Sequence, residues 1–213
     1  MAALRLTVWS DYLCPWCFNA SVRLETLQQE LGDALEIEWR AYLLRPAPRP
    51  AGQGPGELER FVRYTQSWLR PAAEPDAGTF RVWESSAGPP SHSVPAHLAA
   101  KAAERLGRAS FDALHGRLLR AYFAESRDVS ERATLEAVWR EAGLPPDAFQ
   151  AVDDPALLRQ VLAEHADALE QGVTGVPAAR LEGQDAVLLG ALPLETYRRW
   201  LQRHLPREAG AGG

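Results

Sequence analysis

Both cysteines of this chain lie in one short segment, SDYLCPWCFNA, which spans residues 10–20. The residues before it, Leu4–Trp9, alternate between apolar and polar side chains and predict a strand. The residues after it, Phe18–Gly32, carry leucines at helical spacing and predict a helix that ends at Gly32. Alternation returns over Leu35–Arg40, so the first forty residues predict a strand–helix–strand unit with parallel strands and a right-handed crossover.

The middle of the chain has a different pattern from its two ends. A connector rich in proline and glycine, Arg45–Glu57, follows the second strand, and helical patterns then continue to about Gly172. Two short antiparallel strand patterns, VPAARLEG and AVLLG, and a final amphipathic helix complete the chain. The predicted helices are Glu57–Arg70, Pro95–Gly107, Ser110–Ala124, Ser130–Ala142 with Ser130 as N-cap, Asp154–Gln171 with Asp154 as N-cap, and Pro193–Leu205.

This order of elements predicts one α/β unit that is interrupted by a block of helices. At 213 residues, of which 46% are hydrophobic, the chain is long enough to bury a sizeable core. We expect residues 1–42 and 173–206 to form the α/β domain and residues 43–172 to form a helical insertion domain. Residues 207–213 are expected to be a flexible tail.

Charge and hydropathy exclude several classes of function. A net charge of −5 argues against nucleic acid as the main partner, because a phosphate backbone attracts clustered Lys and Arg. No apolar run approaches the roughly 18 residues that would span a bilayer, and the N-terminus lacks the apolar core of a secretory signal. We therefore expect a cytoplasmic protein, in which a CxxC pair is more typical of a catalytic or metal site than of a structural disulfide.

The CPWC segment has the arrangement that a reactive thiol needs. With Cys14 as N-cap, Pro15 occupies the first helical position, where its missing N–H is tolerated. The free amides of Trp16 and Cys17 and the positive end of the helix then stabilise a thiolate at Cys14. This arrangement predicts Cys14 as the nucleophile and Cys17 as the resolving thiol in disulfide exchange.

Three other interpretations of the cysteine pair stay open at this point: a metal site, a structural disulfide, and two cysteines that lie in a buried strand–helix corner by coincidence. A zinc site usually needs four ligands, and the five histidines of the chain form no second cluster that would complete one, so we expect no metal. A structural disulfide across four residues closes too short a loop to restrict the unfolded chain much. The redox interpretation is therefore the favoured one.

A family resemblance adds to this interpretation. CPWC after an N-terminal strand, together with GVTGVP at Gly172–Pro177, resembles the DsbA family of thioredoxin-fold proteins. The segment LLRAYFAESRDVSERATLEAVWREAGL, Leu118–Leu144, is similar to its cytoplasmic FrnE-like branch. The resemblance covers about residues 4–205. It implies a thioredoxin-like core (βαβ…ββα with a mixed central sheet), a large all-α insertion, and a cytoplasmic protein thiol–disulfide oxidoreductase.

The resemblance also implies roles for residues outside the cysteine pair. Val176 and Pro177 would be joined by a cis peptide bond beside the thiols and, with Trp16, would bind an extended substrate. From the residues alone, a trans proline at the first position of a strand is the alternative. Trp16 stands where strongly oxidising periplasmic members carry histidine, so their oxidising power is not carried over to this chain.

The expected partners are protein or small-molecule thiols and disulfides, with no cofactor beyond the Cys14–Cys17 disulfide. Glutathione as a co-substrate and the oligomeric state are left open. One rival function is a glutathione-dependent isomerase or transferase of the kappa/2-hydroxychromene-2-carboxylate isomerase type, which uses serine where Cys14 stands. A second rival is a non-catalytic, chaperone-like binding module that uses the helical block.

Three further sets of residues have two interpretations each. Asp11 either tunes the thiols, directly or as a proton relay, or is an ordinary acidic residue at a loop end. His165 fits a partly buried surface residue better than a catalytic base. A set of aromatic residues in the helical block fits a core better than a substrate groove; its members are Trp68, Trp83, Tyr122, Phe123 and Trp139.

Overall fold

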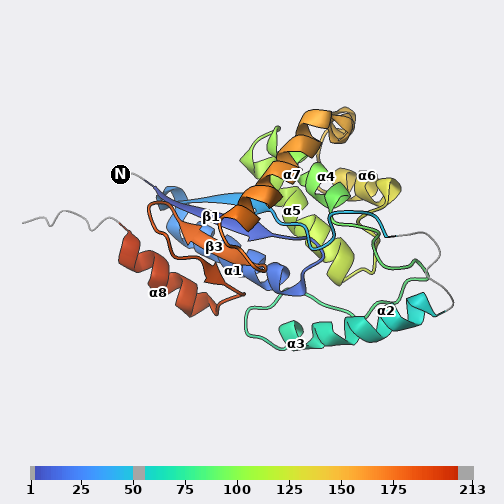
Figure 1. Ribbon diagram of the computed structural model, residues 1–213, viewed down its shortest axis with the longest axis horizontal. Helices are drawn as coiled ribbons and strands as arrows, with labels where there is room; N and C mark the ends of the chain where they lie inside the picture. Colours follow the sequence, from blue (N-terminus) through green and yellow to red (C-terminus); the bar gives the residue numbers. More distant parts are fainter. Residues whose placement is uncertain (1–2, 50–55, 206–213) are drawn as a thin grey trace, which may run out of the picture.

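The computed structural model describes residues 3–49 and 56–205 (Figure 1). Within these ranges, four strands form one mixed sheet in the order β2-β1-β3-β4. The strands are β1 (Leu4–Ser10), β2 (Leu35–Ala41), β3 (Ala178–Leu181) and β4 (Leu188–Leu189). The chain is therefore an α/β protein with a mixed sheet and many inserted helices, as predicted.

Strand pairing follows the pattern expected from the two ends of the chain. β1 runs parallel to β2, with Leu4 opposite Leu35, and antiparallel to β3, with Val8 opposite Ala179. β3 and β4 are antiparallel neighbours. The predicted parallel pair near the N-terminus and the predicted antiparallel pair near the C-terminus are both confirmed, and β1 joins them in one sheet.

The two faces of the sheet are covered by different helices. Val8 belongs to the main hydrophobic cluster, together with Leu24 and Leu27 of helix α1 (Pro15–Leu31). The next residue, Trp9, belongs to a separate small cluster with Ala168 of helix α7 (Pro155–Glu170). Because successive side chains of a strand point to opposite faces, α1 and α7 cover opposite faces of the sheet. Helix α8 (Leu194–His204) packs beside α1 (Figure 1).

The remaining helices lie between β2 and α7 in the chain and share a core with the sheet. The main hydrophobic cluster runs without interruption from Leu6 of β1 to Trp139 in the helical block. All five aromatic residues of the predicted set are buried in this cluster, so they belong to the core. These helices are α2 (Glu57–Thr65), α3 (Leu69–Ala72), α4 (Val94–Glu104), α5 (Arg108–Phe123) and α6 (Arg132–Glu141), with 3-10 segments η2 (Gln66–Trp68) and η3 (Pro146–Asp153). A further 3-10 segment, η1 (Gly32–Ala34), joins α1 to β2.

Two local predictions about the helices are wrong. The helix expected over Glu57–Arg70 is divided into α2, η2 and α3. Ser130 does not cap α6, whose N-cap is Glu131, because the Ser130 hydroxyl accepts the N–H of Ser91 and donates to the Asp128 carboxylate. Of the predicted connector, residues 50–55 lie outside the described residues, as does the predicted tail, residues 207–213.

Arg23 fastens the C-terminal part of the chain to α1. Its guanidinium is almost fully buried and donates hydrogen bonds to the carbonyls of Ala191 and Leu192, at 3.1 and 3.0 Å. A third hydrogen bond, at 2.8 Å, reaches the carbonyl of Pro75, and Glu74 lies within 3.6 Å as a counter-ion. One buried cation therefore holds the segment before α8 and the loop after α3 against the same helix.

Replacing this buried cation should destabilise the fold. Arg23→Gln removes hydrogen bonds from a charged donor and leaves buried carbonyls unpaired, so we expect the free energy of unfolding to fall by about 2–4 kcal/mol. The matched control is Arg5→Gln, whose side chain is 62% exposed and pairs with Glu36 at the surface; it should change the stability by less than about 0.5 kcal/mol. Urea denaturation followed by tryptophan fluorescence measures both, and equal effects would contradict the assignment.

Candidate active site

The CPWC segment forms the N-terminal turn of α1. Cys14 is the N-cap residue and Pro15 occupies the first helical position, as predicted from the sequence. The backbone N–H of Cys17 donates to Cys14 Sγ at 3.4 Å and to the Cys14 carbonyl at 3.0 Å. The sulfur of Cys14 therefore sits at the positive end of a 17-residue helix and replaces the hydroxyl or carboxylate that commonly caps such an end.

The two thiols lie in different environments, although both are buried. Cys14 is 5% exposed and Cys17 is 0% exposed, and both are free thiols in the structure. The pKa of Cys17 is raised well above its ordinary value, mainly by burial and secondly by the neighbouring Cys14. Hydrogen bonds from Asp11 and Ser10 have the opposite, smaller effect on this pKa. Cys17 is therefore held as a neutral thiol behind Cys14, which lies closer to solvent.

The GVTGVP segment reaches the cysteine pair because of the strand register. Trp9 pairs with Ala178 in the antiparallel β1–β3 ladder, so residues that follow β1 lie next to residues that precede β3. The thiol of Cys14 donates to the carbonyl of Val176 at 3.4 Å. The Val176–Pro177 peptide bond is cis, the isomer that the family resemblance implies. Pro177 is buried, whereas Val176 is half-buried at the side of the sulfur.

Trp16 lies at the second helical position, directly between the two cysteines. Its side chain is half-buried, so part of the indole remains accessible beside the thiols. The structure thus places all three predicted substrate-binding residues near Cys14. Trp16 is close because it is two residues away in the sequence, whereas Val176 and Pro177 are brought close by the pairing of β1 with β3. Their contact with a substrate stays a prediction.

Asp11 is fully buried, and its carboxylate binds the backbone of the turn. One oxygen accepts the N–H of Leu13 and the other accepts the N–H of Leu44, both at 2.6 Å. Burial raises the pKa of Asp11 to about 6, against the lowering effect of hydrogen bonds from Ser93, Leu13 and Leu44. The Asp11 backbone carbonyl also accepts the N–H of Cys14 at 3.1 Å. Asp11 therefore holds the shape of the turn that carries the thiols, and its effect on their chemistry stays a prediction.

A buried polar chain beside the turn was not predicted from the sequence. The Tyr12 hydroxyl bonds to Nδ1 of His115 at 2.8 Å, and Nε2 of the same ring bonds to the Ser21 hydroxyl at 2.8 Å. Burial lowers the pKa of His115 to about 3, so the ring is neutral at physiological pH. Tyr12 and His115 are 103 residues apart, and neither belongs to a local motif that would have indicated the contact.

His165 has a backbone partner of its own. Its Nδ1 accepts the N–H of Leu43 at 3.1 Å and its ring packs edge-on against Tyr42, which agrees with the predicted surface role. In the described ranges, no group of three or more His, Cys, Asp or Glu side chains is placed to hold a metal ion. Nor does any helix in these ranges have the length and apolar character needed to span a membrane.

A family model described as the DSBA-like thioredoxin domain matches residues 5–202. Among curated proteins, 47 residues are 38% identical to the uncharacterized protein YwbO of Bacillus subtilis (strain 168); the match covers 22% of this chain and only 22% of that protein.

Solved structures with the same fold cover nearly the whole chain. The probable DsbA oxidoreductase of Streptomyces coelicolor is 24% identical with a TM-score of 0.75, over 99% of this chain and 93% of that chain. The cytosolic disulfide reductase DsbM of Pseudomonas aeruginosa is 23% identical with a TM-score of 0.73, over 95% and 98%. A structure of DsbM with GSH is 24% identical, with a TM-score of 0.72 over 95% and 99%. Because these structures are only 23–24% identical to this chain, the similarity shows that they share its fold and nothing more.

The different environments of the two thiols should appear as different reactivity. Iodoacetamide at pH 7.5 should label native protein once, on Cys14, with Cys17 at least about tenfold slower because only a thiolate reacts. Cys17→Ser should keep the fast label, and Cys14→Ser should be labelled quickly only after unfolding. Mass spectrometry of tryptic peptides identifies the site, and fast labelling of Cys17 in folded protein would contradict this assignment.

Asp11 should make stability depend on pH. Its folded pKa of about 6 lies above the ordinary value of 3.8, so stability from this group is full below pH 4 and is lost as the pH rises through 6. We expect the stability of the native chain relative to Asp11→Asn to fall by up to about 3 kcal/mol between pH 4 and pH 7. Urea denaturation at each pH measures the difference, and a constant difference would show that Asp11 does not titrate in this range.

Proposed function

Because the chain belongs to the DSBA-like thioredoxin domain family, we propose that it is a thiol–disulfide oxidoreductase whose reactive pair is Cys14 and Cys17. The observation that carries the proposal is the hydrogen bond from the Cys17 N–H to Cys14 Sγ at the start of α1. An N–H donor at the positive end of a helix stabilises a thiolate, and the thiolate is the nucleophile in disulfide exchange.

The exchange has two steps. The Cys14 thiolate attacks one sulfur of a substrate disulfide, the other substrate sulfur leaves as a thiolate, and a mixed disulfide forms. Cys17 then loses its proton and attacks Cys14 Sγ, which releases the second substrate sulfur and forms the Cys14–Cys17 disulfide. Two electrons pass from the protein dithiol to the substrate, and the reverse sequence oxidises a substrate dithiol.

Deprotonation of Cys17 is the difficult part of the second step. Burial keeps this thiol neutral while Cys14 is free, and the neighbouring Cys14 is the second cause of its raised pKa. When Cys14 is tied up in a mixed disulfide it carries no negative charge, so the coupling that opposes a Cys17 thiolate is removed. The Asp11 and Ser10 hydrogen bonds then stabilise the thiolate that attacks.

The substrate is proposed to lie along Val176 and Pro177, with Trp16 on the other side of the sulfur. The contact of 3.4 Å between Cys14 Sγ and the Val176 carbonyl supports this placement, because a substrate bonded to Cys14 would pass beside the Val176 backbone. An extended segment there could pair with that backbone as an added strand does. Affinity would then come from main-chain hydrogen bonds, which suit substrates of varied sequence.

Finer assignments are also proposals. We place the protein in the FrnE-like branch and in the cytoplasm, with residues 1–42 and 173–206 as the thioredoxin-like domain and 43–172 as the helical insertion domain. The similarity to DsbM, which is described as a cytosolic disulfide reductase, supports the location and a reducing role. The DsbM structure with GSH supports glutathione as the small thiol that exchanges with Cys14.

A redox titration tests the proposed function. In glutathione buffers the tryptophan fluorescence should report a two-electron transition, since Trp16 lies between the cysteines, with a midpoint within roughly −220 to −320 mV. The transition should be absent in Cys14→Ser, and reduction of an insulin disulfide should fall to the uncatalysed rate.

Two results would contradict the proposal. The first is a pair of thiols that stay inert to both dithiothreitol and oxidised glutathione. The second is a Cys17→Ala variant that turns over an aromatic substrate with glutathione at the wild-type rate, which would favour the isomerase or transferase alternative. A midpoint well above the expected range would leave the exchange chemistry in place and reverse the proposed direction of electron flow.

A further inference from the structure

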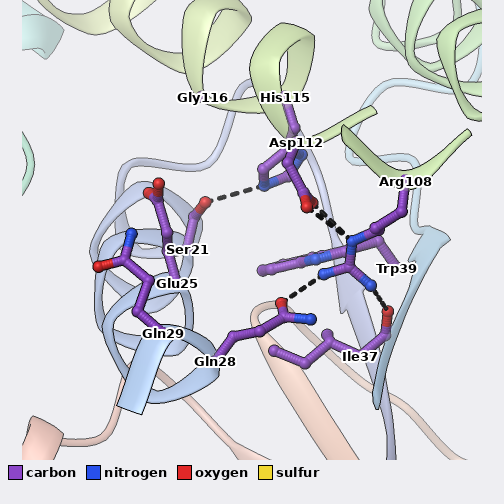
Figure 2. A pocket seen from close by; sticks show the side chains of 10 residues that line it. All are labelled: Ser21, Glu25, Gln28, Gln29, Ile37, Trp39, Arg108, Asp112, His115 and Gly116. Atoms are coloured by element: carbon purple, nitrogen blue, oxygen red, sulfur yellow. Dashed lines mark hydrogen bonds and ion pairs between the residues drawn. The ribbon is translucent and has the colours of Figure 1, made fainter. Parts of the chain in front are cut away.

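A pocket lies between α1 and α5, over the side chains of β2, as Figure 2 shows, and neither cysteine lines it. Its volume of about 220 Å³ is below the roughly 300–1,000 Å³ typical of sites for drug-sized ligands. Glu25 and Gln29 at its rim are exposed, so the pocket opens to solvent. A pocket of this size takes a single small group. We call it the α1–α5 pocket.

The charge of the α1–α5 pocket is negative. Arg108 lines it, but its Nε donates to both Asp112 carboxylate oxygens, at 2.7 and 2.9 Å. The terminal nitrogens of Arg108 donate to Oε1 of Gln28 and to the carbonyl of Ile37, as Figure 2 shows. The charge of Arg108 is thus neutralised by Asp112, and its guanidinium is held in the pocket wall by hydrogen bonds. Glu25 has no hydrogen-bond or ion-pair partner among residues 3–49 and 56–205, so its negative charge is not compensated by a neighbouring cation.

The floor of the pocket is aromatic and carries no charge. Trp39 lies at its centre, with its ring 4.5 Å from the His115 ring between centroids. Both His115 nitrogens are already bonded, to Ser21 and Tyr12, and the lowered pKa keeps the ring neutral. An indole attracts cations through its electron-rich face, whereas a neutral imidazole does not repel them.

Gly116 opens the pocket at a cost to helix α5. A glycine inside a helix is about 1 kcal/mol less favourable than alanine. A Cβ at Gly116 would meet nothing closer than the flexible end of Arg120, at 3.5 Å, so close packing does not require the glycine. Since Gly116 lines the pocket, the missing methyl group leaves the pocket wider there.

From these observations we propose that the α1–α5 pocket binds one small organic cation, an alkylammonium or alkylguanidinium group. The charge pairs with Glu25 and lies near the Trp39 indole, and the alkyl stem rests against Trp39 and Ile37. Such a group is carried either by a free amine or by a Lys or Arg side chain of another molecule. The site is separate from the cysteine pair, so it does not depend on the proposed redox function.

Ligand titration with matched probes tests the site. Butylammonium and butylguanidinium chloride, added at low ionic strength, should produce saturable shifts in the ¹H–¹⁵N spectrum at the Trp39 indole and at α1 and α5. Neutral 1-butanol, which has a similar shape but no charge, should bind at least about threefold more weakly than either cation. Sodium chloride, which supplies a cation without the alkyl stem, should also bind at least about threefold more weakly. The acetylated amide of Gly-Arg-Gly distinguishes the sources: tighter binding than butylguanidinium indicates a protein side chain, and weaker binding indicates a free amine.

Two variants and a control complete the test. Glu25→Gln should weaken butylammonium binding by about threefold or more, whereas Glu182→Gln, at an exposed site after β3, should leave it unchanged. Gly116→Ala should raise the melting temperature by about 2–4 °C and yet weaken binding by about threefold or more. Equal affinity for 1-butanol, equal effects of the two Glu→Gln variants, or shifts remote from the pocket would overturn the proposal.

Discussion

A buried carboxylate holds together the backbone segments that frame the thiols of Cys14 and Cys17. Asp11 accepts the N–H groups of Leu13 and Leu44, and its own carbonyl accepts the N–H of Cys14. One residue therefore ties the end of β1 to the first turn of α1 and to the segment after β2. Cys14, the N-cap of α1, lies in this turn. The position of the Cys14 sulfur thus depends on a carboxylate that acts through backbone hydrogen bonds.

The sheet and helix α1 then bring distant parts of the chain to two places. The β1–β3 register sets Val176 beside Cys14, across 162 residues of sequence. The N-terminus of α1 carries the thiols, its middle packs on the sheet, and its solvent-side face forms one wall of the α1–α5 pocket. The Tyr12–His115–Ser21 chain runs between these regions inside the protein. Helix α1 therefore contributes residues to both the cysteine pair and the α1–α5 pocket.

Local chemistry was enough to predict most of the secondary structure and part of the site. Period-two alternation located β1 and β2, and proline at the first helical position placed Cys14 as the N-cap of α1. These features depend on residues within one or two turns of each other. The same reasoning failed at Ser130, because Ser91, from another part of the chain, takes its hydroxyl as an acceptor.

The sequence by itself thus determined the pair of thiols at a strand-to-helix junction and the order of strands and helices around it. Only the tertiary structure decided which groups surround that pair. Asp11 was ambiguous in the sequence because its partner Leu44 lies 33 residues away, and the Tyr12–His115 contact spans 103 residues. Such long-range hydrogen bonds form only where packing brings distant parts of the chain together. Hydrophobic periodicity and helix-capping signals describe neighbouring residues, so they do not predict which distant residues will meet.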